Sequence, residues 1–323
     1  MEKIKQLKEE FTSFMGQVPF TYRPAELYAP ITYTLFQKGK RLRPMLCLLA
    51  CDMFGGDLEE AKYPALALET FHNSTLIHDD IMDQAPLRRG METVYKKWNT
   101  NAAILSGDAM VALSFDFVMR TPKALETVRL LSQVYHEICD GQQYDINFET
   151  RSDVTIPEYL EMIRLKTAVL LATSLQMGAL VAGASETDQR LLYDYGIAIG
   201  MAFQLQDDLL DCYGDEAVFG KKTGGDILEN KKTYMLLKAL EMASPAQRSA
   251  LEHWFSLSAV DQPQLKVQAV KQLYDQLHVK EVVGQVISDY FTQADAFLDA
   301  VGVPEERKSS LKTYVLMLSG RDK

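Results

Sequence analysis

Two short acidic segments stand inside long apolar stretches of this chain. They are DDIMD at residues 79–83 and DDLLD at residues 207–211, and apolar helical turns precede each of them. Unpaired carboxylates are costly to bury in such surroundings. Because residues four apart share one face of a helix, the first and last aspartate of each segment should project together. This pattern favours a bound cation over a solvated acidic turn.

The composition of these segments favours magnesium. Carboxylate oxygens without clustered histidine suit Mg²⁺, which keeps several waters and shares its coordination shell with substrate phosphates. Cys212 follows the second segment, but a thiol is not an expected ligand of such an ion. Basic pairs follow both segments, at residues 88–89, 221–222 and 231–232. Acidic and basic groups together predict a metal-bridged polyphosphate site.

Helical periodicity runs through almost the whole chain. Apolar residues recur at spacings of three and four, with no competing strand alternation, and Pro122, Pro157, Pro245, Pro263 and Pro304 stand where new helices should begin. We therefore predict an all-α protein, an antiparallel bundle of ten or more helices. The expected helices are 4–14, 42–54, 58–83, 102–119, 124–148, 159–184, 186–213, 233–242, 265–277, 279–301 and 305–318.

Length and charge limit the remaining possibilities. The 323 residues, 47% of them hydrophobic, contain no linker-like or low-complexity tract, which favours one domain over residues 1–323. A net charge of −10 argues against nucleic-acid binding. The start of the chain lacks the apolar core of a signal peptide. Four cysteines without a paired spacing indicate buried thiols in a cytoplasmic protein.

One apolar segment raises the question of a membrane span. Residues 167–184 contain no charged side chain, and their length approaches that of a transmembrane helix. Because the segment contains Thr173, Ser174, Gln176 and many small residues, we interpret it as a buried helix within the bundle.

Several motifs in order resemble the trans-isoprenyl diphosphate synthases, or polyprenyl synthetases, from Gly39 through the C-terminal tail. They are GKRLRP (39–44), HNSTLIHDDIMDQAPLRRG (72–90), GD (107–108), KT (166–167), FQLQDDLLD (203–211) and GKKTGGDILENKKT (220–233). The resemblance implies an all-α barrel around a central cavity, usually in a homodimer. It implies condensation of isopentenyl diphosphate with an allylic diphosphate, which is dimethylallyl, geranyl or farnesyl diphosphate.

The resemblance also assigns roles around the acidic segments. The implied metal ligands are Asp79 and Asp83 for two Mg²⁺ ions and Asp207 with Asp211 for a third, with Asp80 and Asp208 as shared or supporting ligands and Mn²⁺ as a substitute. The allylic diphosphate would be held by Arg88, Lys166, Lys221 and Lys231. Positive charge there would stabilise the leaving diphosphate as the carbon–oxygen bond breaks. Thr167 and Gln204 would orient groups beside the resulting cation.

Isopentenyl diphosphate would bind without metal, through basic side chains. The implied anchor consists of Lys40, Arg43, His72 and Arg89, with Arg41 nearby. Its terminal alkene carbon attacks the allylic cation, and a proton is then lost to restore a double bond. The sequence presents no obvious protein base, and the family resemblance implies that the released diphosphate takes this proton.

Side-chain size before the first acidic segment bears on product length. Ser74 and Thr75 are small, whereas Phe71 stands one turn deeper and Phe115 follows the GD motif. Since a helical turn rises about 5.4 Å, close to one isoprene unit, a floor at Phe71 and Phe115 favours a C20 product. A C15 or longer product remains open, as do two other classes: a class I terpene cyclase and an inactive partner subunit.

Overall fold

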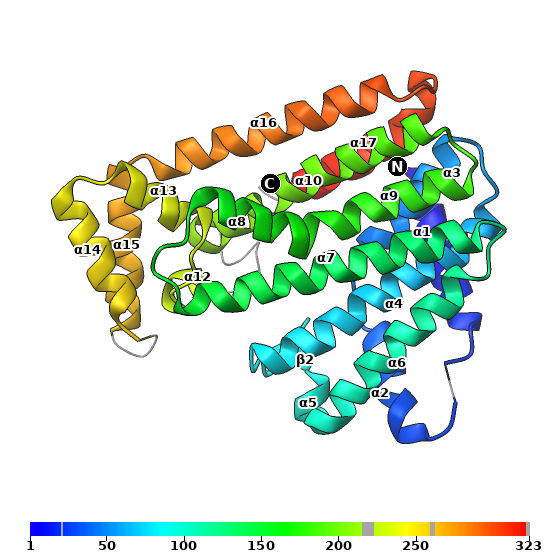
Figure 1. Cartoon of the computed structure of the whole chain (residues 1–323), viewed down its shortest axis with the longest axis horizontal. Helices are drawn as coiled ribbons and strands as arrows, with labels where there is room; N and C mark the ends of the chain where they lie inside the picture. The colour runs from blue at the N-terminus through cyan, green and yellow to red at the C-terminus, as the bar shows by residue number, and fades with distance from the viewer. Residues whose placement is uncertain (21, 215–222, 259–261, 321–323) are drawn as a thin grey trace. The chain divides into compact units, whose positions relative to one another are not determined.

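The computed structural model describes residues 1–20, 22–214, 223–258 and 262–320 (Figure 1). Most of these residues are helical, which confirms the all-α prediction of ten or more helices. Strands in this part of the chain are limited to one antiparallel pair, β1 (Leu87–Arg88) and β2 (Met91–Glu92). Two-residue strands are too short to show an alternating pattern, so periodicity could not predict them.

The described residues divide into two compact units. The first, unit 1, contains Met1–Gln133, Thr173–Tyr193 and Val301–Met317. The second, unit 2, contains Val134–Ala172, Asp194–Ala300 and the residues from Leu318 onward. The single domain over residues 1–323 stays a prediction.

Unit 1 contains the GKRLRP segment (39–44) and the segment 72–90, which includes the first acidic segment. Its elements are α1 (Glu2–Gln17), α2 (Ala25–Leu35), α3 (Leu42–Met53), α4 (Leu58–Met82), the β1–β2 hairpin, α5 (Val94–Lys97), α6 (Thr100–Val118) and most of α17 (Glu305–Ser319). Helices α4 and α6 pack closely, because Gly107 leaves room for the ring of His78. A Cβ atom at residue 107 would lie 2.2 Å from His78 Nε2.

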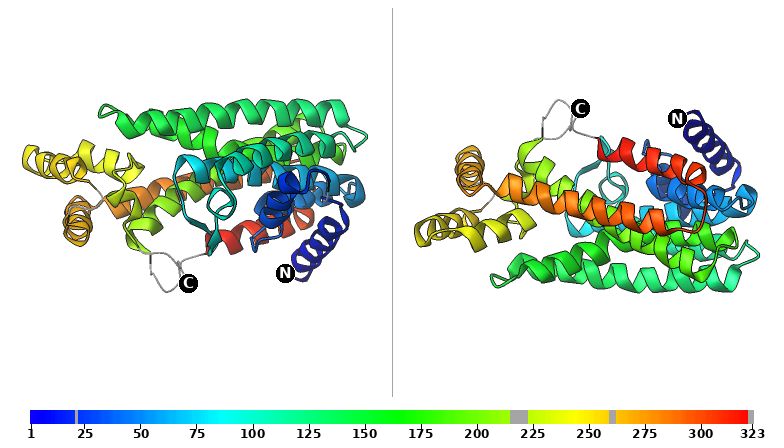
Figure 2. Two further views of the ribbon diagram at one scale, coloured as in Figure 1. Left: turned by 90° about the horizontal axis from the view of Figure 1, so that it is seen from below. Right: turned by 90° about the horizontal axis from the view of Figure 1, so that it is seen from above.

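Unit 2 contains the second acidic segment. Its elements are α8 (Ile156–Ile163), the π-helical turn η1 (Arg164–Ala168), α12 (Gly225–Leu228), α13 (Tyr234–Met242), α14 (Pro245–Ser256), α15 (Pro263–Gln276) and α16 (Val279–Ala300). Helices α14 and α15 lie side by side (Figures 1 and 2). Helices α7 (Ala124–Thr150), α9 (Val169–Val181) and α10 (Glu186–Tyr213) contribute residues to both units.

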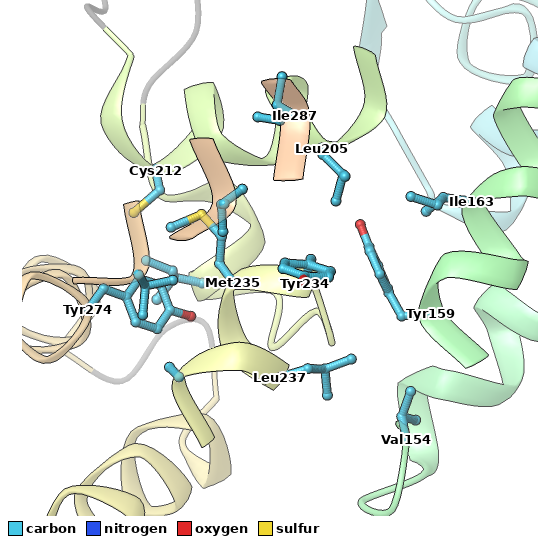
Figure 3. Packing of buried hydrophobic residues seen from close by; sticks show 14 of the residues in the cluster. Val154, Tyr159, Ile163, Leu205, Cys212, Tyr234, Met235, Leu237, Tyr274 and Ile287 are labelled. Carbon is cyan, nitrogen blue, oxygen red and sulfur yellow. The ribbon is translucent and has the colours of Figure 1, made fainter. Parts of the chain in front are cut away.

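The core of unit 2 is rich in tyrosine. Tyr159, Tyr234 and Tyr274 are buried in one cluster with Leu205 and Cys212 (Figure 3). In this view the Tyr159 hydroxyl points toward α10, which carries Leu205. Because a buried tyrosine hydroxyl usually finds a hydrogen-bond partner, this cluster directs a polar group toward the second acidic segment.

The helix boundaries agree well with the prediction where proline marks them. Pro157, Pro245 and Pro263 occupy the first turns of α8, α14 and α15, where the missing N–H costs nothing. Thr155 and Ser244 complete capping boxes at the first two of these starts. Helices α2, α5, α12 and α14 were absent from the predicted helices, although Pro245 was expected to begin one.

Two expectations about exposure are tested by the structure. Cys47, Cys51 and Cys212 are free and buried, but Cys139 is exposed, so the prediction of buried thiols was wrong for that residue. Within the described part of the chain, one helix, α6, is long and apolar enough to cross a membrane, and it is not the 167–184 segment. Helix α6 packs against α4 and α2.

Candidate active site

The first acidic segment forms the C-terminal end of α4. Asp83 is the exposed residue that ends the helix, and Asp79 is half-buried one turn before it. Asp80 is buried and accepts a hydrogen bond from Arg88 Nε at 2.7 Å. Burial raises the pKa of the Asp80 carboxyl, while Arg88 opposes that shift. Asp79 and Asp83 are therefore the more accessible pair, and Asp80 is bound to the protein.

A tight hairpin returns two arginines toward this helix end. Leu87 pairs with Glu92 and Arg88 with Met91, which leaves Arg89 and Gly90 in the turn. Both have positive φ, 54° and 78°, as two-residue hairpin turns of the favoured type require. The hairpin thus fixes Arg88 beside Asp80.

Basic groups gather around His72 in unit 1. Burial lowers the pKa of the His72 imidazole well below its usual value, and Arg43, Arg89 and Arg88 lower it further. His72 is therefore neutral at ordinary pH. Gly39 lies against Arg89, since a Cβ atom there would be 3.4 Å from Arg89 Nη1. The structure thus brings together most of the anchor that the sequence predicted.

Arg43 carries a buried donor without an acceptor. Burial lowers the pKa of its guanidinium to about 10. Among the described residues, nothing accepts a hydrogen bond from its Nε atom. Because buried donors are nearly always satisfied, this atom indicates a place for an anion.

Arg41 lies in the interior. Its guanidinium donates to Glu69 Oε1 at 2.5 Å and to the carbonyl oxygens of Leu35 and Gln37 at 2.6 and 2.8 Å. The Arg41 and Glu69 side chains are only 7% and 4% exposed. The sequence placed Arg41 near the phosphates; its burial and its partners instead indicate support for the turn that carries Lys40, which is exposed, and Arg43.

The second acidic segment shows the same division of roles within unit 2. Asp207 is exposed and Asp211 is half-buried. Asp208 is buried and accepts hydrogen bonds from the Tyr159 hydroxyl and from Gln204 Nε2. Burial, reinforced by the charge of Asp226, raises the pKa of Asp208 to about 8. The middle aspartate is again held by the protein and the outer two are more accessible.

The KT pair occupies the π-helical turn η1. This turn lies between α8 and α9, and the backbone of α7 approaches it closely at Gly141. A Cβ atom at residue 141 would lie 2.5 Å from the Lys166 backbone nitrogen. Thr167 Oγ1 donates to Gln204 Oε1 at 3.0 Å, which joins the KT pair to the Asp208 network. Lys166 Nζ forms an ion pair with Asp145.

The loop after α10 carries the last predicted basic residues. Lys231 is 55% exposed and forms ion pairs with Asp226 at 3.4 Å and Glu229 at 3.1 Å. The Asp226 backbone N–H donates to Asp211 Oδ2 at 3.0 Å, so the loop contacts the acidic segment directly. Lys221 lies outside the described residues.

The proposed chain-length residues lie along α4 and α6. Phe71 is fully buried and Ser74 nearly so. The Ser74 hydroxyl donates to the Phe71 carbonyl at 2.6 Å, and the Thr75 hydroxyl to the His72 carbonyl at 2.8 Å. Both hydroxyls are thus satisfied by their own helix. Phe115 is half-buried on α6.

The comparisons with known proteins agree with this geometry. The family model for polyprenyl synthetase matches residues 24–277. The chain belongs to the polyprenyl synthetase family. As a member it is a prenyltransferase.

Individual relatives carry several product names. The chain is 40% identical to "Geranylgeranyl diphosphate synthase" of Methanosarcina mazei over 245 residues, 75% of this chain and 76% of that protein. It is 40% identical to "Heptaprenyl diphosphate synthase component 2" of Bacillus subtilis over 217 residues, 66% and 61% of the two chains. A solved geranylgeranyl pyrophosphate synthase is 42% identical and superimposes with a TM-score of 0.94 over 99% of both chains.

Polyprenyl synthetases generally depend on Mg²⁺. The described residues contain no group of three or more histidine, cysteine or acidic side chains already close enough to hold a metal. They contain two accessible carboxylates in each of the two acidic segments. Hard oxygen donors with room for water and phosphate are what Mg²⁺ prefers, so the donor set fits.

The structure adds contacts of the candidate site residues that the sequence did not reveal. Tyr159 holds Asp208, Asp145 pairs with Lys166 and Glu69 pairs with Arg41. Tyr159 precedes Lys166 by two helical turns on the same helical stretch. This spacing from the KT motif could have indicated that Tyr159 lies near the candidate site. Asp145 and Glu69 come from other helices, and no local pattern marks them.

Proposed function

We propose that this prenyltransferase condenses isopentenyl diphosphate with allylic diphosphates and yields geranylgeranyl diphosphate. The observation that carries the proposal is the buried Arg43 Nε atom, which lacks an acceptor among the described residues and lies in a cluster of basic groups. An anion there would satisfy the donor and offset the clustered charge. Relatives named geranylgeranyl synthases support the product.

The isopentenyl anchor in this proposal consists of Lys40, Arg43, His72 and Arg89. Arginine forks bind phosphate oxygens in a bidentate manner, and neutral His72 can donate one N–H without adding charge. Arg41 does not contact the substrate in this scheme. Its ion pair with Glu69 supports the turn that carries Lys40 and Arg43.

The metal ligands in this proposal are the accessible aspartates of each segment. Asp79 and Asp83 would hold two Mg²⁺ ions and Asp207 with Asp211 a third, while Asp80 and Asp208 stay bound to Arg88 and to Tyr159 with Gln204. When bound, the ions supply Lewis-acid assistance to departure of the allylic diphosphate. The protein keeps the middle aspartates fixed, which sets the direction of the outer ones.

Basic residues of each unit would act on the leaving group in this scheme. Arg88, Lys166 and Lys231, together with Lys221, would neutralise the charge that develops on the departing diphosphate. Thr167 and Gln204 are hydrogen-bonded to each other and to Asp208, so their dipoles are held in place beside the cation. Loss of a proton to the released diphosphate completes the condensation.

Product length in this proposal is set along α4. The growing chain passes Ser74 and Thr75, whose hydroxyls are bound to their own backbone and present little bulk. Phe71, with Phe115 of α6, forms the floor. Phe71 lies eight residues before Asp79, about 12 Å along the helix, which favours C20 over C15.

The test is one incubation series with labelled isopentenyl diphosphate and dimethylallyl, geranyl or farnesyl diphosphate, with products separated by chain length. We expect a C20 product from all three primers. Phe71→Ala should shift the distribution toward longer chains, and Ser74→Phe toward shorter ones. Cyclised products would indicate a terpene cyclase, and no product would indicate a partner subunit. An unchanged distribution in both variants would show that the floor lies elsewhere.

We further propose that the protein is a cytoplasmic homodimer and folds as one domain. The family resemblance supports the dimer, and the reduced cysteines support the compartment. Light scattering at micromolar concentration should give twice the chain mass. A monomeric mass would contradict this assembly.

A further inference from the structure

Lys266 of α15 is fully buried in unit 2. Its Nζ atom donates to Asn230 Oδ1 at 2.6 Å and to the Leu257 carbonyl at 3.1 Å, and it lies 5.7 Å from the ring centroid of Phe255. Taking an ammonium group out of water costs several kcal/mol, and an apolar side chain would fill the same space without that cost. The lysine therefore has a role that packing alone does not explain.

Lys266 contacts the loop that carries Lys231, through Asn230. Asn230 has a φ of 58°, in the left-handed region. Its side chain is fixed from two sides, because Nδ2 also donates to the Leu257 carbonyl at 3.0 Å. Lys232 Nζ donates to the Asn230 carbonyl at 3.1 Å. The backbone that presents Lys231 is thus tied to Lys266 and Leu257 at the residue before it, and Lys232 closes the turn locally.

The neighbouring residue of α15 contacts the other end of the same loop. A Cβ atom on Gly224 would lie 2.8 Å from both methyl carbons of Val267, and Gly224 has a φ of 87°. The Gly224 N–H donates to the Asp211 carbonyl at 2.6 Å, and the Asp226 N–H donates to Asp211 Oδ2. Helix α15 therefore meets the loop at Gly224, which itself contacts Asp211, and at Asn230, four residues after the Asp226 contact with Asp211.

Helix α15 is itself anchored next to that segment. Tyr274, two turns after Lys266, is buried in the same cluster as Cys212, the residue that follows Asp211 (Figure 3). Helix α15, which contacts the loop, and α10, which carries the acidic segment, thus pack into one hydrophobic core. A shift of the loop relative to Asp211 would require that core to repack.

We propose that Lys266 is a positioning residue. It holds the loop of Asp226 and Lys231 against Asp211, so that Lys231 and the metal that Asp211 would bind act on the same diphosphate. This inference rests on the function proposed above. Its consequence is that truncating a side chain remote from the substrate weakens binding of diphosphate and metal at the second acidic segment. The isopentenyl anchor of unit 1 shares no residue with this network.

The test compares Lys266→Met with Lys238→Met, which removes a lysine of the same unit that forms an i,i+3 ion pair with Glu241. We expect Lys266→Met to raise the Mg²⁺ concentration for half-maximal activity by about 10-fold, the lower end of the loss that follows removal of a direct partner of a metal ligand, because Lys266 acts on Asp211 only through the loop. The KM for isopentenyl diphosphate should stay within about twofold. Lys238→Met should match the wild type in all of these measurements.

Calorimetric binding of inorganic diphosphate with Mg²⁺ supplies a readout that does not require turnover. It should weaken by a similar factor in Lys266→Met. If that variant does not fold, Asn230→Ala removes the same contact, and Asn230→Asp, which keeps the acceptor for Lys266 but loses the donor to the Leu257 carbonyl, should bind more tightly than Asn230→Ala. Wild-type values in Lys266→Met, with only a lower melting temperature, would overturn the inference. An inactive wild type would instead reject the proposed function and leave the calorimetric comparison valid.

Discussion

The buried Arg41–Glu69 ion pair allows a quantitative prediction about the turn that carries Lys40 and Arg43. Replacing Arg41 with methionine leaves the Glu69 carboxylate, only 4% exposed, without its cationic partner. Breaking a buried pair in this way typically costs about 3–5 kcal/mol. The Leu35 and Gln37 carbonyls lose a donor in the same step. We therefore expect the free energy of unfolding to fall by about 3–5 kcal/mol.

A double-mutant cycle separates the ion pair from simple loss of packing. Arg41→Met combined with Glu69→Met removes both charges, and buried pairs replaced by apolar residues are often neutral or stabilising. The double variant should thus be more stable than Arg41→Met alone, with a coupling energy above about 2 kcal/mol. Urea denaturation followed by circular dichroism measures all three variants. Lys312→Met, which breaks an exposed ion pair with Glu305, should cost less than about 1 kcal/mol.

The same substitution has a kinetic consequence. Because Arg41 supports the turn between Lys40 and Arg43, its loss should raise the KM for isopentenyl diphosphate more than the KM for the allylic substrate. Two results would refute the reasoning. One is a free energy of unfolding for Arg41→Met within about 1 kcal/mol of the wild-type value. The other is a double variant whose loss of stability equals the sum of the losses in the two single variants.

Three further predictions follow from the described contacts. Asp79→Ala and Asp207→Ala should each lower turnover by orders of magnitude while helical circular dichroism is retained, and chelation of Mg²⁺ should abolish wild-type activity; full turnover in either variant would exclude these ligands. Lys40→Ala should raise the KM for isopentenyl diphosphate far more than that for the allylic substrate, and equal increases would contradict separate anchors. Gly107→Ala should cost about 1–3 kcal/mol by overpacking against His78, which thermal unfolding measures; addition of His78→Ala should recover part of the loss.

Local patterns were sufficient to predict most helices. The interior Pro64 of α4 did not interrupt the predicted helix, because apolar periodicity continued on both sides of it. Helix α2 was missed because Pro30 and several β-branched residues lower its helical propensity. It forms through tertiary packing against α6 and α4, which no local window contains.

The site was predictable where its residues were clustered in the sequence. The two acidic segments and the basic pairs that follow them were found from their spacing. The grouping of Lys40, Arg43, His72 and Arg89 came from the family resemblance, and in the structure Arg43 and Arg89 lie near His72 in unit 1. The role of Arg41 was not predictable, because its partner Glu69 comes from another helix. Lys266 was missed for the same reason, since Asn230 lies 36 residues before it in the sequence.

The π-helical turn at Arg164–Ala168 makes the register of its helix sensitive to deletions. A π turn contains one residue more than the i+4 turn of an α-helix, so it is equivalent to a one-residue insertion that the helix absorbs in place. Removing one residue there would let the helix close into a regular α-helix. Every side chain on one side of the deletion would then rotate by about 100° relative to the other side, and Tyr159 and Thr167 would no longer reach the same α10 network. Among homologous chains, the length of this segment should therefore vary less than that of the surface loops.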